Sequence, residues 1–324
     1  MELNTSKTDS ASSPTSGVRL MTMITETVLP KRLHVWKQSS KDFHVTDTKV
    51  STEDKAVLLQ ATYLLAAGNL YVVTYKIYPS GIVHVNAKFT STDMQAAETE
   101  VSEATRMATF TPGSDAARKA ASKLEVPRIG VRFRLPAQMN NVQYFGRGPE
   151  ENYIDRNHGT MVGIYQTTAD KMYFNYVRPQ ENGHHTDTRG LTCLPIRKRL
   201  VIVADSLIGF NALRNSVEDF DSEEALPHPY QWNNFSPEEA ANHDEKAARN
   251  VLRRMHHVND VTPRDFVEVC VDMKQQGVGG YDSWGARPEP FHQIPANREY
   301  NWGFTLVPVR SGSQATEAAK YDYR

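Results

Sequence analysis

Cysteine is scarce in this chain, with only Cys193 and Cys270 in 324 residues. Neither of them stands in a Cys-x-x-Cys pair or in another zinc-ligand spacing. A disulfide-rich scaffold and a cysteine-based zinc site are therefore excluded. We expect both cysteines to be small buried residues, and a single disulfide between them is the alternative.

Long hydrophobic runs are also missing. Stretches such as Leu191–Ile196 are far shorter than the roughly 20 apolar residues that cross a bilayer. Residues 1–17 are rich in serine and threonine and have no apolar centre, so we interpret them as a disordered leader and not as a signal peptide. The chain thus predicts no membrane partner, and it leaves the compartment open between cytoplasm and periplasm.

An excess of charge of one sign is absent as well. Lysine and arginine total 37 against 38 for aspartate and glutamate, which gives a formal net charge of −1. A protein that binds nucleic acid needs a basic face, so this balance argues against such a partner. The sequence also lacks a Gly-x-Ser-x-Gly elbow, a phosphate-binding loop and a dinucleotide fingerprint.

The sequence is rich in the alternation of apolar and polar residues that is typical of half-buried β-strands. In Arg128–Leu135, for example, Val131 and Phe133 alternate with Arg132 and Arg134. Similar patterns predict strands at Lys31–Val45, Lys55–Thr62, Leu70–Tyr78, 82–87, Asn141–Gly146, Arg199–Ala204, Ile208–Leu213, Phe266–Met273 and Tyr300–Val309. The fold class is therefore all-β with minor α, in one large domain or in two.

Two stretches interrupt this pattern. Residues 91–123 are polar and alanine-rich, and we expect an excursion that is part helix and part loop. After an acidic loop, Ser236 precedes a proline and two glutamates, which is a helix-capping arrangement. The helix that follows, to about Arg253, is charged nearly all round, so we expect a surface insertion.

Polar and aromatic residues crowd into the stretch from Tyr144 to Gly190. A tight polar turn at 146–153 is followed by Asp155 and Arg156, and further aromatic and charged residues lie at 173–183. Because an isolated buried charge is costly, this composition predicts a buried hydrogen-bonded network. A salt-bridged corner that ties loops to the sheet is the favoured interpretation, and a catalytic site is the alternative.

Some residues in these stretches are eligible for chemistry by type. Two histidine pairs suggest a metal site, namely His184-His185 near Asp187 and His256-His257 near Asp260. Adjacent strand residues point to opposite faces, so each pair offers one ligand only, and hydrogen-bonded or solvated histidines are favoured. Glycoside hydrolysis needs two carboxylates beside the scissile bond, and the eligible residues are Glu150, Glu151 and Glu181.

The stretch Gly277–Ala286 places one large aromatic residue, Trp284, among glycines. Glycines at 277, 279 and 280 permit positive φ and close backbone approach. Asp282 and Ser283 can fold their side-chain oxygens onto nearby N–H groups. The loop is therefore predicted to hold the indole ring at a surface, and a plug at the bottom of a core is the alternative.

Three motifs follow one another in the chain. They are Tyr-Phe-Gly-Arg-Gly-Pro-Glu-Glu-Asn-Tyr-x-Asp-Arg at 144–156, Tyr-Val-x-Pro-x-Glu-Asn-Gly at 176–183 and Gly-Val-Gly-Gly-x-Asp-Ser-Trp at 277–284. Together they resemble the C-terminal domain of the large β-galactosidases of glycoside hydrolase family 2. The likeness runs over about 31–308 and is poorest at 221–250, and the second motif is more similar to the Bacteroidetes branch than to the enterobacterial one.

This resemblance implies a galactose-mutarotase-like β-supersandwich at 18–310, with a surface helical insertion at about 221–254 and a disordered tail at 311–324. In that family the catalytic glutamates and the magnesium and sodium sites lie in a (β/α)8 barrel that precedes this domain. We therefore expect an isolated fragment of a retaining β-galactosidase, with no catalytic residue, metal or cofactor of its own. Its expected partners are the upstream domains and a galactoside substrate, and a homo-oligomer stays open.

The same resemblance implies that Trp284 lines the galactose subsite, with Asp282 and Ser283 beside it in the substrate-binding loop. Tyr281 stands where many relatives have aspartate, a departure that affects the local hydrogen bonds of the loop. Further candidates for substrate contact are Glu181, His185 and Arg178.

Three functions follow, in this order of preference. The first is a catalytically silent part of a parent β-galactosidase. The second is an autonomous carbohydrate-binding module that uses Trp284 with Tyr173 or Trp232 as a sugar platform. The third is an aldose epimerase, which needs a histidine and a carboxylate in one groove, and His185 with Glu181 is the pair to test.

Overall fold

The computed structural model describes residues 13–15, 36, 39, 43–65, 68–91, 125–177, 179–194, 199–220, 258–279, 288–318 and 320. The strands are β1 (Ser13–Thr15), β2 (His44–Glu53), β3 (Ala56–Leu64), β4 (Leu70–Ile77), β5 (Val83–Thr90), β6 (Arg128–Pro136), β7 (Asn141–Gly148), β8 (Met161–Thr168), β9 (His185–Leu194), β10 (Arg199–Leu213), β11 (Phe266–Gln275) and β12 (Tyr300–Val309). The α-helices of this part are α6 (Ala169–Met172) and α8 (Gly312–Ala318). All strand pairings are antiparallel, and the predicted all-β class with minor α is confirmed.

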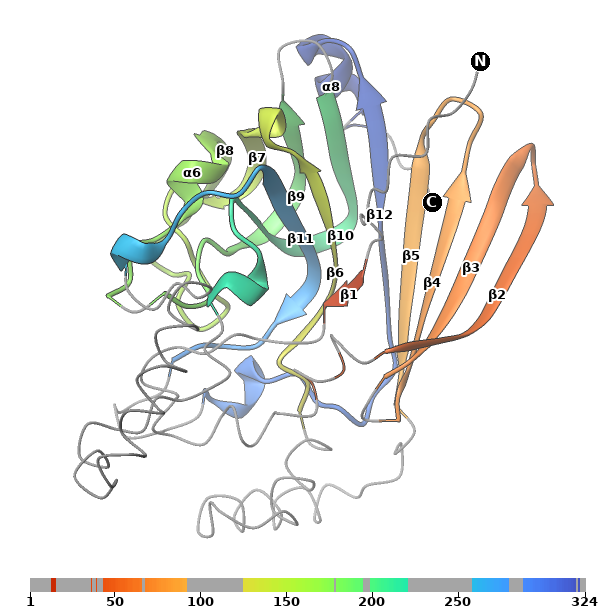
Figure 1. Cartoon of the computed structure of the whole chain (residues 1–324), viewed down its shortest axis with the longest axis horizontal. Helices are drawn as coiled ribbons and strands as arrows, with labels where there is room; N and C mark the ends of the chain where they lie inside the picture. The colour runs from red at the N-terminus through yellow and green to blue at the C-terminus, as the bar shows by residue number, and fades with distance from the viewer. Residues whose placement is uncertain are drawn as a thin grey trace, which may run out of the picture.

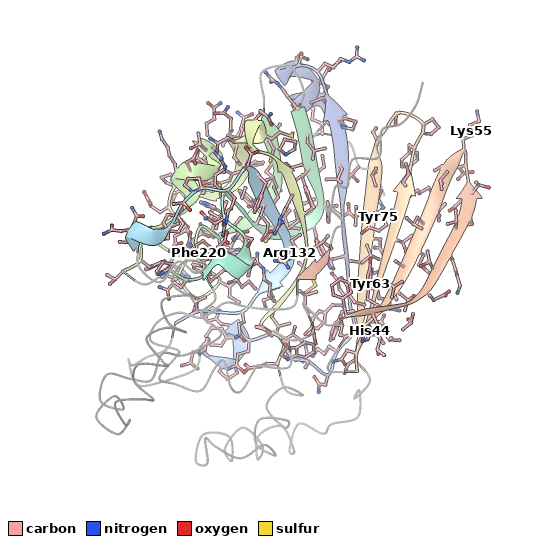
Figure 2. All side chains as sticks on the ribbon, in the orientation of Figure 1. His44, Lys55, Tyr63, Tyr75, Arg132 and Phe220 are labelled. Carbon is pink, nitrogen blue, oxygen red and sulfur yellow. The ribbon has the colours of Figure 1, made fainter. Side chains whose placement is uncertain are left out.

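Strands β2 to β5 form a meander at one side of the fold, which we call the wing (Figure 1). Its outer hairpin runs from His44 at one end to the turn at Lys55 at the other (Figure 2). Along β5 the side chains alternate, with Val85 and Ala87 buried and His84 half buried on the opposite face. Strands β3 to β5 therefore bury one face, as the alternation in their sequence predicts, whereas every residue of β2 is exposed.

The hydrogen-bonded order of the sheet is β1-β6-β11-β10-β12-β5-β4-β3-β2, and β9, β7 and β8 branch from β10. Strand β10 joins the two halves, because it pairs with β12 over 199–204 and with β11 over 209–213. The sequence predicts two strands here, since polar residues interrupt the apolar pattern. The structure corrects this to one strand of 15 residues, whose register against β9 shifts near its middle.

Tyr71 joins two strands that lie far apart in the sheet. It lies on β4, yet its hydroxyl donates to the carbonyl of Gly130 on β6 at 3.2 Å and accepts from Trp302 Nε1 at 3.3 Å. Because β4 and β6 are far apart in the strand order, this contact shows that the sheet curls enough for β4 to face β6 across the core. Buried aromatic and aliphatic side chains fill the space between them, including Phe89 and Phe304.

His84 on β5 and Asp205 on β10 form a pair that spans the strand between them. His84 Nε2 lies 2.9 Å from Asp205 Oδ2, and each side chain is 15% exposed. The intervening strand is β12, where Gly303 lies opposite Asn86. A Cβ atom at Gly303 would collide with the Asp205 carboxylate and lie 2.9 Å from the carbonyl oxygen of Val85. The glycine therefore lets Asp205 reach His84, and the pair fastens the wing to β10.

Both segments that the sequence predicts to be disordered contain regular structure. Ser13–Thr15, within the predicted leader, form β1, which pairs with β6. Gly312–Ala318, within the predicted tail, form helix α8. The helix buries Ala315 and Ala318 against Val201 and its neighbours, and this small apolar face is hidden in a sequence that is polar overall.

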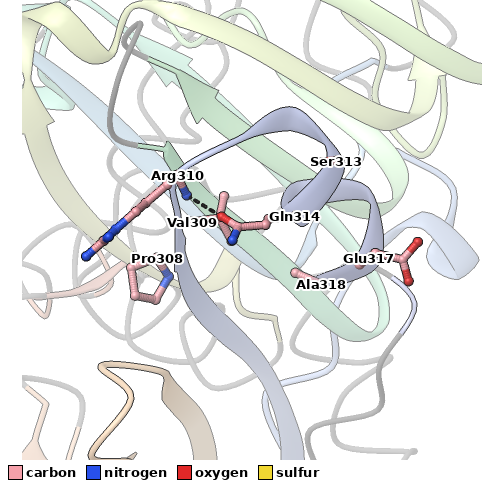
Figure 3. Close-up of a pocket in the computed structure, with 7 residues that line it drawn as sticks. All are labelled: Pro308, Val309, Arg310, Ser313, Gln314, Glu317 and Ala318. Carbon is pink, nitrogen blue, oxygen red and sulfur yellow. Dashed lines mark hydrogen bonds between the residues drawn. The ribbon is translucent and has the colours of Figure 1, made fainter.

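Helix α8 folds back on the end of β12 (Figure 3). The backbone N–H of Arg310 donates to Oε1 of Gln314 at 2.8 Å, and this bond fixes the turn between strand and helix. An open hollow of about 550 Å³ lies beside it, lined by residues such as Pro308 and Glu317.

Further predictions concern the two cysteines, membrane-spanning helices and the two stretches that interrupt the strand pattern. Cys193 and Cys270 are buried and free, and burial raises the pKa of Cys193 to about 12, so the interpretation as small buried residues is confirmed. Within the described ranges, no helix has the length and apolar character to cross a bilayer. The excursion at 91–123, apart from Ser91, and the insertion at 221–254 lie outside the described residues.

We expect Gly303→Ala to lower the free energy of unfolding by about 1–3 kcal/mol, because the methyl group displaces Asp205 and breaks its pair with His84. Urea and thermal unfolding measure the change. Gly159→Ala is the control, since no heavy atom lies within 4 Å of its Cβ position. Equal stabilities for the two variants would show that the pair does not fasten the wing.

Candidate functional site

Loops from three parts of the chain meet beside the ends of β7, β9 and β11. They are residues 149–156, 173–184 without Arg178, and 276–279, and we call their meeting point the polar corner. It contains most of the first two sequence motifs and the beginning of the third. The predicted hydrogen-bonded network is confirmed here, because side chains of the first loop bond to both of the others.

Asn152 fixes the first loop to the start of β9. Its Nδ2 donates to the carbonyl oxygens of Arg147 and Glu150 at 3.1 and 3.0 Å. Its Oδ1 accepts from the backbone N–H and the hydroxyl of Thr186 at 2.9 and 2.6 Å. Its backbone N–H donates to the carbonyl of His184 at 2.7 Å. The buried side chain has partners for both ends of its amide, so it determines the path of the loop.

Glu151 joins the first loop to the second. Its Oε2 accepts from the backbone N–H of Gly183 at 2.6 Å, and its Oε1 accepts from Arg156 at 2.7 Å and from the hydroxyl of Tyr176. Arg156 also donates to Tyr176 Oη at 3.1 Å. The carboxylate is 6% exposed and has three donors, so it acts as a connector between loops.

A buried ion pair lies beside these loops. Arg128 on β6 donates from Nε and Nη2 to the two oxygens of Asp272 on β11, at 2.8 and 2.5 Å. Both side chains are 0% exposed. Burial alone would lower the pKa of Arg128, but Asp272 and the other negative groups nearby hold it well above its ordinary value. The pair therefore stays ionised, and its two parallel bonds offset the cost of removing both charges from water.

Glu181 is a third ionisable residue beside this pair. Its Oε2 lies 3.4 Å from Arg128 Nη1, and its Oε1 accepts from Asn211 Nδ2 at 3.4 Å. Burial raises the pKa of Glu181 to about 7, Arg128 opposes this rise, and the negative charges of Asp272 and Glu151 add to it. Glu181 therefore gains or loses its proton near neutral pH.

The adjacent residues His184 and His185 are both buried, in different surroundings. His184 stacks on Tyr153 with ring centroids 5.4 Å apart. His185 packs against Tyr144 and its Nδ1 lies 3.0 Å from the carbonyl oxygen of Arg147. Burial lowers the pKa of both, to about 4 for His185, so both rings are neutral at pH 7. The interpretation as a hydrogen-bonded histidine is confirmed for His185.

Asp155 contacts the base of the glycine loop. Its Oδ2 accepts from the backbone N–H of Gly279 at 2.7 Å. A Cβ atom at Gly277 would lie 2.6 Å from the same oxygen, so the missing side chain leaves room for the carboxylate. The first and third sequence motifs, which are 124 residues apart at this contact, therefore meet in space.

Several predicted site residues lie outside the described residues, namely Trp284, Asp282, Ser283, Arg178, Trp232 and the pair His256-His257. Glu181 and His185 are 3% and 2% exposed, and each bonds to a different set of partners. The described geometry therefore does not place this pair in an open groove, as an epimerase would need. Among the carboxylates eligible for catalysis, Glu150 is exposed, and Glu151 is already bonded to Arg156 and to the backbone N–H of Gly183.

The sequence interpretation missed Arg128, Asp272 and Asn211. Their signal is a polar residue inside an apolar strand, because Asp272 follows Val-Cys-Val on β11 and Asn211 interrupts the apolar second half of β10. A charge or amide at such a position needs a partner. The sequence does not show which residue the partner of Asp272 is, because Arg128 lies 144 positions away.

Glu181 predicts a dependence of stability on pH. Its pKa is about 7 in the folded chain and roughly 4.3 in the unfolded chain, so the folded state binds the proton more tightly. This contribution is fully present below the unfolded pKa and is lost as the pH rises through about 7. We expect Glu181→Gln to remove it, so that the variant gains on the order of 3 kcal/mol relative to the unchanged chain from about pH 4.5 to pH 8.

Urea unfolding at several pH values measures this difference. Glu150→Gln is the control, because Glu150 is an exposed glutamate of the same loop. A difference between the Glu181→Gln variant and the unchanged chain that stays constant with pH would contradict the raised pKa.

Comparisons with known proteins assign this chain to a family. A family model described as "Beta galactosidase small chain" matches residues 18–306. The β-galactosidase of Priestia megaterium (strain DSM 319 / IMG 1521) is 28% identical over 283 residues, which are 87% of this chain and 22% of that protein. The β-galactosidase of Streptococcus thermophilus is 24% identical over 286 residues, 86% of this chain and 22% of that protein. This chain thus spans about a fifth of the length of these curated relatives.

Among solved structures, the chain is similar to a putative aldose 1-epimerase from Escherichia coli K12. The TM-score is 0.35 and the identity 8%, with 82% of this chain and 69% of that chain covered. The family match over residues 18–306 includes all three sequence motifs and most of the described strands. The chain therefore belongs to the β-galactosidase small chain family.

Proposed function

We propose that this chain is a non-catalytic part of a retaining β-galactosidase that hydrolyses terminal β-galactosides. The family match over residues 18–306 carries the proposal, together with relatives named β-galactosidase of which the chain spans about a fifth. A retaining glycosidase uses one carboxylic acid and one carboxylate nucleophile. In this proposal both come from the upstream domains, because Glu151 and Glu181 are buried and already hydrogen-bonded.

The contribution of this chain is an aromatic wall at the galactose subsite. The glycine loop leaves the sheet at the polar corner, and Trp284 follows five residues after Gly279 in the sequence. An indole face stacks on the apolar face of galactose, and the buried area contributes on the order of 1–3 kcal/mol. We expect Asp282 and Ser283, which belong to the same loop, to hydrogen-bond to its backbone through their side-chain oxygens.

We assign no metal or cofactor to this chain. In the part of the chain that the structure describes, histidine, cysteine and carboxylate side chains form no group of three or more that could hold a metal ion. In this proposal the magnesium and sodium that the resemblance implies belong to the upstream barrel.

The alternatives have less support. An autonomous sugar platform would use Trp284 with Tyr173 or Trp232, and both tryptophans lie outside the described residues. The ring of Tyr173 is half buried and stacks on Phe220 at a centroid distance of 5.9 Å. An epimerase would use His185 and Glu181, which are almost fully buried.

We expect the chain to be inactive alone on an aryl β-galactoside and to support hydrolysis when it is mixed with the upstream domains of the parent enzyme, because those domains supply both carboxylates. Release of the aryl alcohol measures both states. Calorimetry with galactose or lactose provides the second arm, and we expect almost no heat from the chain alone.

Two results would contradict this expectation in different ways. Hydrolysis by the chain alone would mean that a catalytic pair lies within it. A clear binding heat without hydrolysis would favour the autonomous carbohydrate-binding module, and Trp232→Ala would then test its platform.

We expect Trp284→Ala in the assembled enzyme to raise KM for a galactoside about 5-fold to 150-fold, since the stacking energy of roughly 1–3 kcal/mol is lost. Steady-state kinetics measures KM and kcat. Phe291→Ala is the control, because Phe291 is an aromatic residue that is 71% exposed. An unchanged KM in the Trp284→Ala enzyme would remove the subsite role from this residue.

A further inference from the structure

The carboxylate of Asp155 is the described side chain nearest to two glycines of the loop base. Its Oδ2 accepts from Gly279 N at 2.7 Å, and the Cβ position of Gly279 lies 3.2 Å from the same atom. At Gly277 the Cβ position lies within 2.6–3.0 Å of three atoms of the Asp155 side chain. Gly277 and Gly279 of the loop base therefore lie against the same carboxylate.

Asp155 is itself held by the fold. It lies in a turn that is closed by a hydrogen bond from Arg156 N to the carbonyl of Tyr153 at 2.7 Å. Tyr153 is 1% exposed and stacks on His184, and Arg156 bonds to Glu151. The residues on both sides of Asp155 are thus anchored to the polar corner, and they fix the backbone position from which its side chain extends.

The residues before Gly279 are held by backbone bonds. Gln276 N donates to the carbonyl of Pro127 at 2.9 Å, and Gly277 N donates to the carbonyl of His292 at 2.8 Å. Beyond these bonds a glycine-rich chain has wide freedom of direction. The charge-assisted bond from Gly279 to Asp155 is then the contact that selects one direction.

We propose that Asp155 is a positioning residue for the glycine loop, which fixes the direction of the chain at Gly279 and thereby the place of Trp284. The role of Trp284 in this statement rests on the proposed function. Asp155 does not touch the substrate, and it acts through the loop backbone. Its loss therefore weakens galactoside binding more than it slows the chemical step.

The direct test labels the chain with 5-fluorotryptophan and records its fluorine NMR spectrum. The chain has four tryptophans, and Trp284→Phe assigns the signal of Trp284. We expect Asp155→Ala to shift or broaden this signal and to leave those of the buried Trp36 and Trp302 in place. Asp155→Asn keeps an oxygen that can accept from Gly279 N, so we expect it to retain the original signal.

Two further variants guard against a folding defect. Gly277→Ala places a methyl group against the Asp155 carboxylate, and it is expected to reproduce the effect of Asp155→Ala while Asp155 is still present. Asp219→Ala is the matched control, because Asp219 also accepts a backbone N–H bond, from Ser216 at 2.9 Å, in another part of the fold. It is expected to leave the Trp284 signal unchanged.

The kinetic arm uses the assembled enzyme. Loss of one hydrogen bond to a charged acceptor implies that Asp155→Ala raises KM about 3-fold to 30-fold with a smaller change in kcat, and that Asp155→Asn restores most of the loss. A Trp284 signal that is the same in the Asp155→Ala, Gly277→Ala and unchanged chains would overturn the positioning role, whatever the kinetics. If the signal moves but Trp284→Ala leaves KM unchanged, the positioning of the loop stands and the proposed subsite fails.

Discussion

The buried pair of Arg128 and Asp272 is the constraint on which the polar corner depends. Each charge would cost several kcal/mol to bury alone, and both side chains are 0% exposed. The bonds at 2.8 and 2.5 Å offset this cost only while β6 and β11 keep their register. The register shift between Asp272 and Lys274 is part of the same arrangement, because a bulge changes the direction of the side chains beside it. The ends of β6 and β11 are thus held together where the glycine loop leaves the sheet.

The same pair influences the ionisation of its neighbours. Glu181 meets Arg128 at 3.4 Å, but its burial makes a second full negative charge costly, so its pKa rises to about 7. His184 stays neutral because burial lowers its pKa and the positive charge of Arg128 lowers it further. A general acid or base must reach its substrate, and these groups are buried. The corner is therefore suited to hold loops in place, as the favoured sequence interpretation predicts.

The sequence predicts the strands that bury one face. It misses other strands for physical reasons. β5 alternates because one side packs on the core and the other is polar. β8 is the outer strand of its hairpin and has no buried residue from Met161 to Thr168, so its pattern carries no inward face. β9 lies between β7 and β10, and it buries Thr186 and Thr188 although they are polar. The site shows the same limit, since Glu151 and Asp155 belong to one motif but bond to residues 32 and 124 positions away, a separation that local patterns do not encode.

Glycine and carboxylate have complementary roles at the start of the loop. The ion pair aligns β6 with β11, and the bond from Gln276 N to the carbonyl of Pro127 extends this alignment one residue beyond Arg128. At Gly277 the missing side chain makes room for Asp155, and at Gly279 that carboxylate receives the backbone N–H. The glycines thus permit a sharp change of direction, and the charges on either side select one direction among those permitted. The direction in which the chain leaves the sheet at Gly279 therefore depends on the Arg128–Asp272 ion pair and on Asp155.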